Sequence, residues 1–146
     1  MNQMAIETVK EAKNKYNVTD VIWHQGESDF IRSTDAENYV NDFKSFQMSL
    51  HNNGVNAPIY MSIATRCMHK NRHKLEWYKD NEIAKAQKKL IDNKTIFLGV
   101  NTDDLLTQED RYDRCHFSEI GQLKVAASLA TSIMRTREKN SRAKNE

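Results

Sequence analysis

Apolar positions along the chain alternate between helix-like and strand-like spacing. Four of them recur at helical intervals before residue 17, and the short apolar run at residues 21–23 then predicts a buried strand. A second helix is expected from about residue 34 to 50, because Thr34 and Glu37 have the spacing of a capping box. Residues 59–63 and 95–100 predict two further strands, separated by a charged helix over residues 75–90.

A final helix is expected after Ser118, a residue that can cap it. Its predicted core-facing side consists of Ile120, Leu123, Ala127, Ala130 and Met134. Alternating helices and strands, with strands that read as continuous apolar runs, favour an α/β fold in which a parallel sheet is covered on both faces. Because such sheets usually have about five or six strands, the three found here suggest that strands are missing.

The composition predicts one soluble domain over residues 1–134. The chain has 146 residues, 29% of them charged, and a formal net charge of +2. This balance argues against a strongly basic nucleic-acid binder, and no apolar run reaches the roughly 18 residues of a membrane span, so we expect neither nucleic acid nor a membrane as a partner. Residues 135–146 carry a formal charge of +3 and the rest of the chain −1, so these residues are expected to form a basic, frayed tail.

Polar clusters follow the first and third predicted strands, where parallel sheets hold their ligands. The first cluster is His24-Gln25-Gly26-Glu27-Ser28-Asp29, directly after Trp23. The other contains Asp113 and His116, and an Asp three residues before a His can bind the imidazole and fix its tautomer, as a general base requires. On spacing alone, both residues could equally be ordinary loop residues.

Together, the two clusters resemble the sialate O-acetylesterase branch of the SGNH hydrolases. The resemblance rests on W-x-Q-G-E-S-D after a strand and on D-x-x-H-F-S before an Ala-rich helix that contains Gly121. It implies a flavodoxin-like three-layer α/β/α fold and a serine esterase that acts on acetylated carbohydrates without a cofactor or metal. The implied catalytic base and acid are His116 and Asp113.

The same resemblance assigns roles to the first cluster. Gln25 corresponds to an oxyanion-hole side chain, and Gly26 allows the tight turn. Glu27, Ser28 and Asp29 are expected to support that loop rather than to react.

The sequence departs from that family in one respect. Family members carry the nucleophilic Ser in a G-x-S segment, and an oxyanion-hole Gly in a second block, both N-terminal to the Gln-Gly-Glu-Ser block. This chain has no place for either, so we expect the C-terminal part of an esterase without its first two strands. The Ser would then come from a separate N-terminal segment, and the chain alone would be inactive.

Two further expectations follow from a truncated chain. The strand at residues 21–23 would be an open edge, which favours self-association. In a truncated chain, the absence of a visible signal peptide would not indicate in which cellular compartment the protein acts.

Three other interpretations use the residues present. Gly26-Glu27-Ser28-Asp29-Phe30 partly fits the nucleophile elbow G-x-S-x-G, with Asp103 or Asp113 and then His116 completing an α/β-hydrolase order. Phe30 in place of the second Gly, and a helix expected to begin near Thr34, argue against it. A non-catalytic carbohydrate-binding or interaction module is a second interpretation, and a nucleotide binder is a third that lacks a Gly-rich phosphate loop.

The remaining histidines and cysteines give weaker signals. His24 is expected to be a packing residue at the strand end. Cys67, His69 and His73 could ligate zinc, but their spacing matches no standard zinc pattern. The two cysteines, Cys67 and Cys115, are too few for a disulfide scaffold, and the sequence leaves their pairing open.

Overall fold

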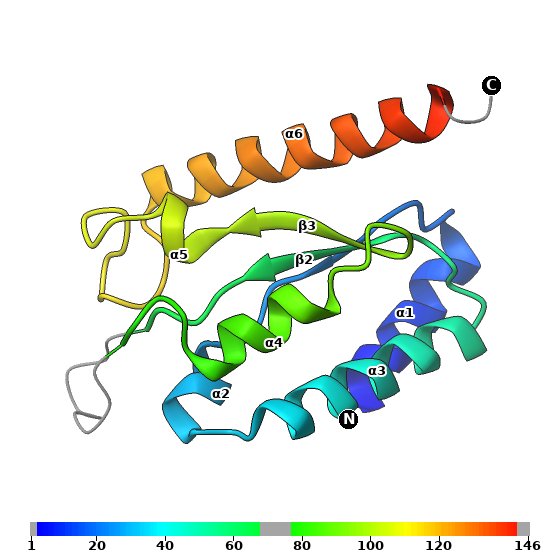
Figure 1. Ribbon diagram of the computed structural model, residues 1–146. Coiled ribbons are helices and arrows are strands. Elements are labelled where there is room, and N and C mark those ends of the chain that lie inside the picture. Colours follow the sequence, from blue (N-terminus) through cyan, green and yellow to red (C-terminus); the bar gives the residue numbers. More distant parts are fainter. Residues whose placement is uncertain (1–2, 68–76, 143–146) are drawn as a thin grey trace.

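The computed structural model describes residues 3–67 and 77–142. Three parallel strands, β1 (Val21–Trp23), β2 (Ile59–Ile63) and β3 (Ile96–Asn101), form a sheet in that order. Helices α1 (Gln3–Lys15), α3 (Ala36–Asn52) and α4 (Glu82–Leu90) lie on one side of the sheet, and α6 (Glu119–Arg142) lies on the other (Figure 1). The structure confirms the predicted α/β fold.

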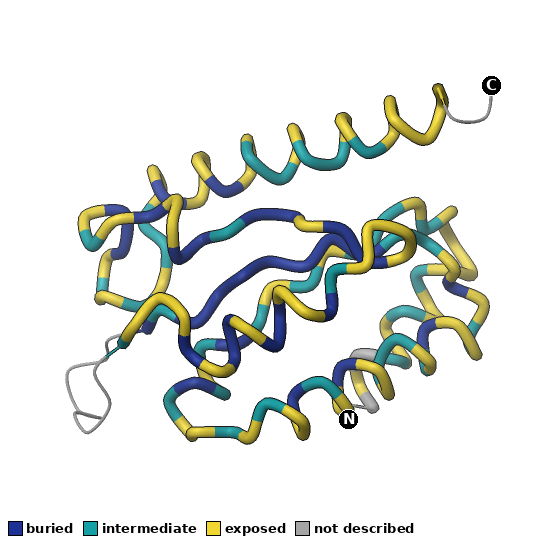
Figure 2. Tube along the Cα trace, viewed as in Figure 1, coloured by how far each residue is buried: buried dark blue, intermediate teal, exposed yellow. Residues whose placement is uncertain are grey.

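The main core lies between the sheet and helices α3 and α4. β2 is buried along its whole length, as its continuous apolar run predicts. Ile83, Ala86 and Leu90 form the buried stripe predicted for α4, although this helix begins at Glu82 and the earlier part of the predicted helix includes residues outside the described ranges. Figure 2 shows the burial concentrated on β2 and on the facing sides of these helices.

The opposite face of the sheet has a much smaller core. Val100, Leu106 and Val125 form its buried cluster, with Phe117 and Leu129 packed against it. The predicted core-facing side of α6 is wrong, because Ile120, Leu123 and Met134 are exposed.

The reason lies at Gly121, where a Cβ would overlap the carbonyl oxygen of Asp110. The helix therefore docks through Gly121 and Val125. It also continues through residues 135–142, which the sequence suggested would be frayed.

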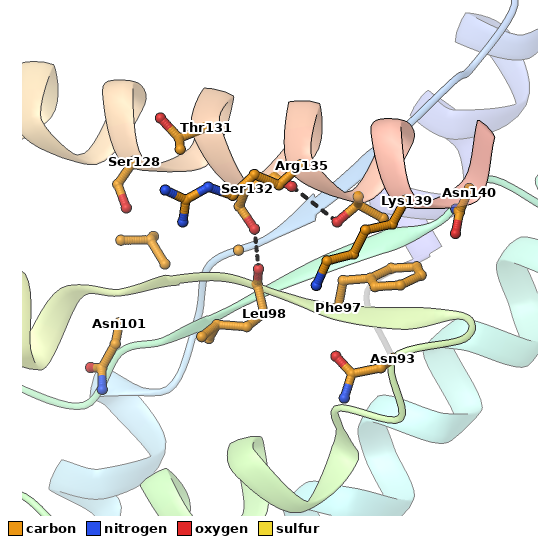
Figure 3. Close-up of a pocket in the computed structure, with 13 residues that line it drawn as sticks. Asn93, Phe97, Leu98, Asn101, Ser128, Thr131, Ser132, Arg135, Lys139 and Asn140 are labelled. Carbon is orange, nitrogen blue, oxygen red and sulfur yellow. Dashed lines mark hydrogen bonds between the residues drawn. The ribbon is translucent and has the colours of Figure 1, made fainter. Parts of the chain in front are cut away.

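A groove of about 700 Å³ runs between α6 and the outer edge of β3. Figure 3 shows Lys139 extending from α6 toward this strand, Arg135 running alongside α6, and Ser132 donating a hydrogen bond to the carbonyl oxygen of Leu98. In the described part of the chain, β3 pairs on one side alone. Positively charged side chains beside the open edge of β3 discourage another strand from pairing there.

Several local features differ from the prediction. Asp35, rather than Thr34, caps α3, because the helix begins at Ala36 and the carboxylate of Asp35 accepts the backbone N–H groups of Glu37 and Asn38. Two short helices were not predicted: α2 (Glu27–Arg32) after β1 and α5 (Thr102–Leu105) after β3.

Strand β1 is at one edge of the described sheet. The side chain of its central residue, Ile22, is 52% exposed, so the expected burial on both faces is not found. None of the described helices is long and apolar enough to cross a membrane.

Candidate active site

The loops at the carboxyl ends of the strands surround a pocket of about 550 Å³. Two segments supply most of its lining: the β1 loop (residues 24–28) and the histidine loop (residues 110–117). The lining residues are His24, Glu27, Ser28, Cys67, Tyr112, Cys115, His116, Phe117 and Gln122. The position matches the edge of a parallel sheet where ligands bind.

Asp113 and His116 form a carboxylate–imidazole pair in the histidine loop. Oδ2 of Asp113 lies 2.6 Å from Nδ1 of His116, while Oδ1 accepts the backbone N–H groups of Cys115 and His116 at 3.0 and 2.7 Å. The bond to His116, followed by the backbone bonds, lowers the pKa of Asp113 to about 2. An ionised Asp113 accepts the Nδ1–H of a neutral His116, which leaves the lone pair on Nε2, as a general base requires.

The pair is accessible from solvent. The side chain of His116 is 62% exposed, and the ring of Tyr112 stacks on it with the centroids 5.7 Å apart. The imidazole can therefore reach a ligand in the pocket without a rearrangement of buried groups.

A disulfide joins Cys115 of the histidine loop to Cys67, which follows β2. The sequence left this pairing open. Because Cys115 is adjacent to His116, the bond ties the imidazole-bearing loop to the sheet. Cys67 is therefore not a free thiolate for zinc, and the other two candidate ligands, His69 and His73, lie outside the described residues.

The β1 loop is held by buried hydrogen bonds. Nε2 of Gln87 donates to the carbonyl oxygen of Gln25 at 2.7 Å and to the hydroxyl of Tyr39 at 3.1 Å, while its Oε1 accepts the N–H of Ala64 at 3.0 Å. Gly26 has a φ of +154°, and a Cβ there would overlap Ala64 O and Gln87 Nε2. The turn therefore requires glycine.

Gln87 was not identified from the sequence. Its signal is a polar residue on the buried side of α4, beside the stripe that contains Ile83, Ala86 and Leu90. A polar residue at such a position must find partners, and here they fix the β1 loop.

The structure does not bring the side chain of Gln25 into the described pocket. Its amide donates to the carboxylate of Asp29. Glu27 and Ser28 do line the pocket together with His116.

Ser28 lies in the second position of α2 and is exposed. The helix expected from about Thr34 is present as α3, but α2 precedes it and begins at Glu27, directly before Ser28, so one argument against a reactive Ser28 is removed. Ser28 nevertheless lacks a positive φ, whereas the nucleophile elbow places its Ser on a strained turn.

Asp103, the other acid considered for an α/β-hydrolase order, has different partners. Its carboxylate accepts bonds from the N–H groups of Thr65 and Arg66 at 3.0 Å and from the Thr65 hydroxyl at 2.6 Å. It therefore fixes the loop after β2, and Asp113 is the acid bonded to His116.

A second carboxylate–imidazole pair lies in the β1 loop. Nε2 of His24 is 3.2 Å from Oε1 of Glu27, and the His24 ring packs edge-on against Phe117 with centroids 5.1 Å apart. Burial alone would raise the pKa of Glu27, but the bond and charge of His24, a backbone N–H and the charge of Arg111 lower it below its ordinary value. The sequence analysis treated His24 as packing, although His24 and Glu27 have the same three-residue spacing as Asp113 and His116.

Comparison with known proteins gives one match. The family model of the carbohydrate esterases described as sialic acid-specific acetylesterases matches residues 1–135. No curated protein and no solved structure matches the chain.

Proposed function

Because the chain belongs to the carbohydrate esterase family of sialic acid-specific acetylesterases, we propose that it provides the base and the acid of a serine esterase that hydrolyses O-acetyl esters on carbohydrates. The observation that carries this proposal is the Asp113–His116 pair, with 2.6 Å between carboxylate and imidazole, in a pocket at the carboxyl ends of the strands. The reaction class is ester hydrolysis, and its chemistry requires no cofactor.

In the proposed mechanism, Nε2 of His116 accepts the proton of a Ser hydroxyl as the oxygen attacks the acetyl carbonyl. Asp113 stabilises the imidazolium that forms. His116 then protonates the departing sugar oxygen, which leaves as a free hydroxyl, and an acetyl-enzyme ester remains. His116 next takes a proton from water as the water attacks this ester, and it returns that proton to the Ser oxygen as acetate is released.

Gln25 is proposed to stabilise the oxyanion. A carboxamide nitrogen carries two N–H donors, and Asp29 accepts one of them. Because the Gln25 side chain does not line the pocket in this structure, the proposed role requires that its second donor turn toward the ester when a substrate binds.

The nucleophile is proposed to come from a segment outside this sequence. The family pattern places it in a G-x-S segment after a first strand, and the described residues pair β1 on one side alone. A parallel strand added beside β1 would end next to the pocket, because the carboxyl ends of parallel strands lie at one edge of the sheet.

Ser28 is the second candidate nucleophile. It lines the same pocket as His116, and the structure gives its hydroxyl no hydrogen-bond partner among the described residues. This candidate would make the chain catalytically complete.

Hydrolysis of 4-nitrophenyl acetate separates these candidates. The chain alone should show no turnover above buffer, and addition of the polypeptide encoded directly upstream should produce turnover that His116→Ala abolishes. Turnover by the chain alone that disappears in Ser28→Ala would assign the nucleophile to Ser28. Carbohydrate binding without hydrolysis under any of these conditions would replace the esterase with a non-catalytic binding module.

A further inference from the structure

The pocket holds a second carboxylate–imidazole pair, His24 and Glu27, besides Asp113 and His116. The mechanism above uses Asp113 and His116 and assigns no role to His24 or Glu27. We propose that His24, oriented by Glu27, binds the carbohydrate by accepting a hydrogen bond from one of its hydroxyl groups at Nδ1. The inference rests on the proposed function in one respect, namely that the ligand is a carbohydrate.

The orientation of the His24 ring is set by two contacts. Oε1 of Glu27 lies 3.2 Å from Nε2, and Phe117 packs edge-on against the ring. Because Glu27 is held in its ionised form, it accepts the Nε2–H of the neutral imidazole. The lone pair of neutral His24 is therefore on Nδ1.

Nδ1 of His24 is available to a ligand. It has no hydrogen-bond partner within residues 3–67 and 77–142, and the side chain is 32% exposed at the wall of the pocket. A free acceptor on a fixed ring complements a sugar hydroxyl, which is a hydrogen-bond donor. A purely structural histidine would need the contacts to Glu27 and Phe117 but no open nitrogen in the pocket.

The surrounding charges define how binding should depend on pH. The titratable groups that line the pocket with His24 are Glu27, His116 and Tyr112, and Arg111 supplies a positive charge near Glu27. Protonation of Nδ1 converts the acceptor into a donor. The proposed bond to a hydroxyl therefore requires the neutral imidazole and is lost when Nδ1 is protonated.

The test is an NMR titration of histidine-labelled protein with N-acetylneuraminic acid, followed at the ring Cε1–H signals from pH 5 to 8. The probe keeps its carboxylate ionised over this range, so a change in affinity reports the protein. The His24 signal should shift on binding, and affinity should rise with pH. His24→Phe, which keeps a ring against Phe117, should bind about 3- to 10-fold more weakly at the upper pH, the range expected for one neutral hydrogen bond.

Two variants keep the test specific. Glu27→Gln removes the charge that fixes the tautomer and should also weaken binding, whereas His51→Gln, at an exposed position of α3, should not. An unchanged His116 signal in each variant shows that the pocket is folded.

Three outcomes would overturn the proposal: no shift of the His24 signal, unchanged affinity in His24→Phe, or affinity that falls as pH rises in the wild type but not in His24→Phe, which would indicate a protonated His24 bound to the carboxylate. All of these readouts are independent of turnover. Loss of ester hydrolysis with binding intact would therefore remove the proposed function and leave the role of His24.

Discussion

The two loops that face each other across the pocket are held in different ways. The β1 loop is fixed by buried hydrogen bonds from Gln87 and by the close approach of Gly26 to its neighbours. The histidine loop is tied to the segment after β2 by the Cys67–Cys115 disulfide, and the bonds of Asp113 hold its own turn. Its imidazole is the more exposed one, because the side chain of His116 is 62% exposed and that of His24 is 32% exposed. One side of the pocket therefore depends on packing, and the other depends on a covalent link and a local turn.

The covalent link explains how the imidazole base can be held in position and still be accessible. An imidazole that takes and returns protons must reach the ligand, which excludes a deeply buried loop. A disulfide holds such a loop without burying it. Its stabilising effect comes mainly from restricting the unfolded chain, and this effect requires no burial of the loop. Substitutions that weaken the contacts of one loop at a time test this difference.

The largest effect is expected for Gly26→Ala. The new Cβ would overlap Ala64 O and Gln87 Nε2 at a backbone conformation that disfavours a side chain, so the free energy of unfolding should fall by about 4 kcal/mol. Urea unfolding measures this change. Gly54→Ala is the control, because it also has a positive φ but meets only the flexible end of Lys13, and it should cost about 1–2 kcal/mol. Equal losses in both variants would contradict the packing account of the β1 loop.

Removal of the disulfide is expected to have the next largest effect. The bond closes a loop with a sequence separation of 48, so the double variant Cys67→Ala/Cys115→Ala should lose about 3–4 kcal/mol of stability. The NMR signal of His116 should broaden or shift more than that of His24. A reducing agent should reproduce the loss in the wild type and leave the double variant unchanged. If reduction affects both proteins alike, the disulfide is not what holds the histidine loop.

A smaller loss is expected for Gln87→Ala, because it removes the partner of the Ala64 N–H and leaves the carbonyl of Gln25 with the Tyr39 hydroxyl as its remaining side-chain donor. The cost should be about 2–3 kcal/mol in urea unfolding. Lys88→Ala, one position along α4 and exposed in an ion pair with Asp80, should leave stability nearly unchanged. A comparable loss in Lys88→Ala would show that Gln87 acts through helix stability rather than through the β1 loop.

The smallest effect is expected for the loss of stability at low pH that comes from protonation of Asp113. Its pKa is about 2 in the folded chain against an ordinary 3.8, so the folded state binds fewer protons than the unfolded state between these values. The resulting stabilisation is present above pH 4 and is lost as pH falls toward 2. Urea midpoints measured from pH 5 down to 3 should therefore fall more steeply in the wild type than in Asp113→Asn. Parallel slopes would show that the bonds of Asp113 do not persist in solution.

Much of the fold was predictable because its strands are continuous apolar runs. The β2 prediction agrees with the structure, and those for β1 and β3 agree to within one residue at each end. The buried side of α6 could not be predicted, because it is chosen by the approach of Gly121 to the backbone of Asp110, a contact between two elements rather than a property of one helix.

The site was predictable in part for a similar reason. Asp113 and His116 are three residues apart in a turn, so their contact is local and their spacing indicated it. The contacts of Gln87 with Gln25 and Ala64 join three separate segments, and no local pattern reports them. The pair of His24 and Glu27 did have a local signal, the same spacing as the other pair, but its Glu lies in α2, a short helix that the sequence analysis did not predict.

The most direct test of the account is the rate at which acetate is released from an O-acetylated sialic acid, followed by proton NMR. The chain is combined with the polypeptide encoded directly upstream, and wild type is compared with His116→Ala. The account predicts release by the wild type, an unchanged rate in Ser28→Ala, and a rate at least about 100-fold lower in His116→Ala. Equal rates in wild type and His116→Ala, or no release by either, would contradict it.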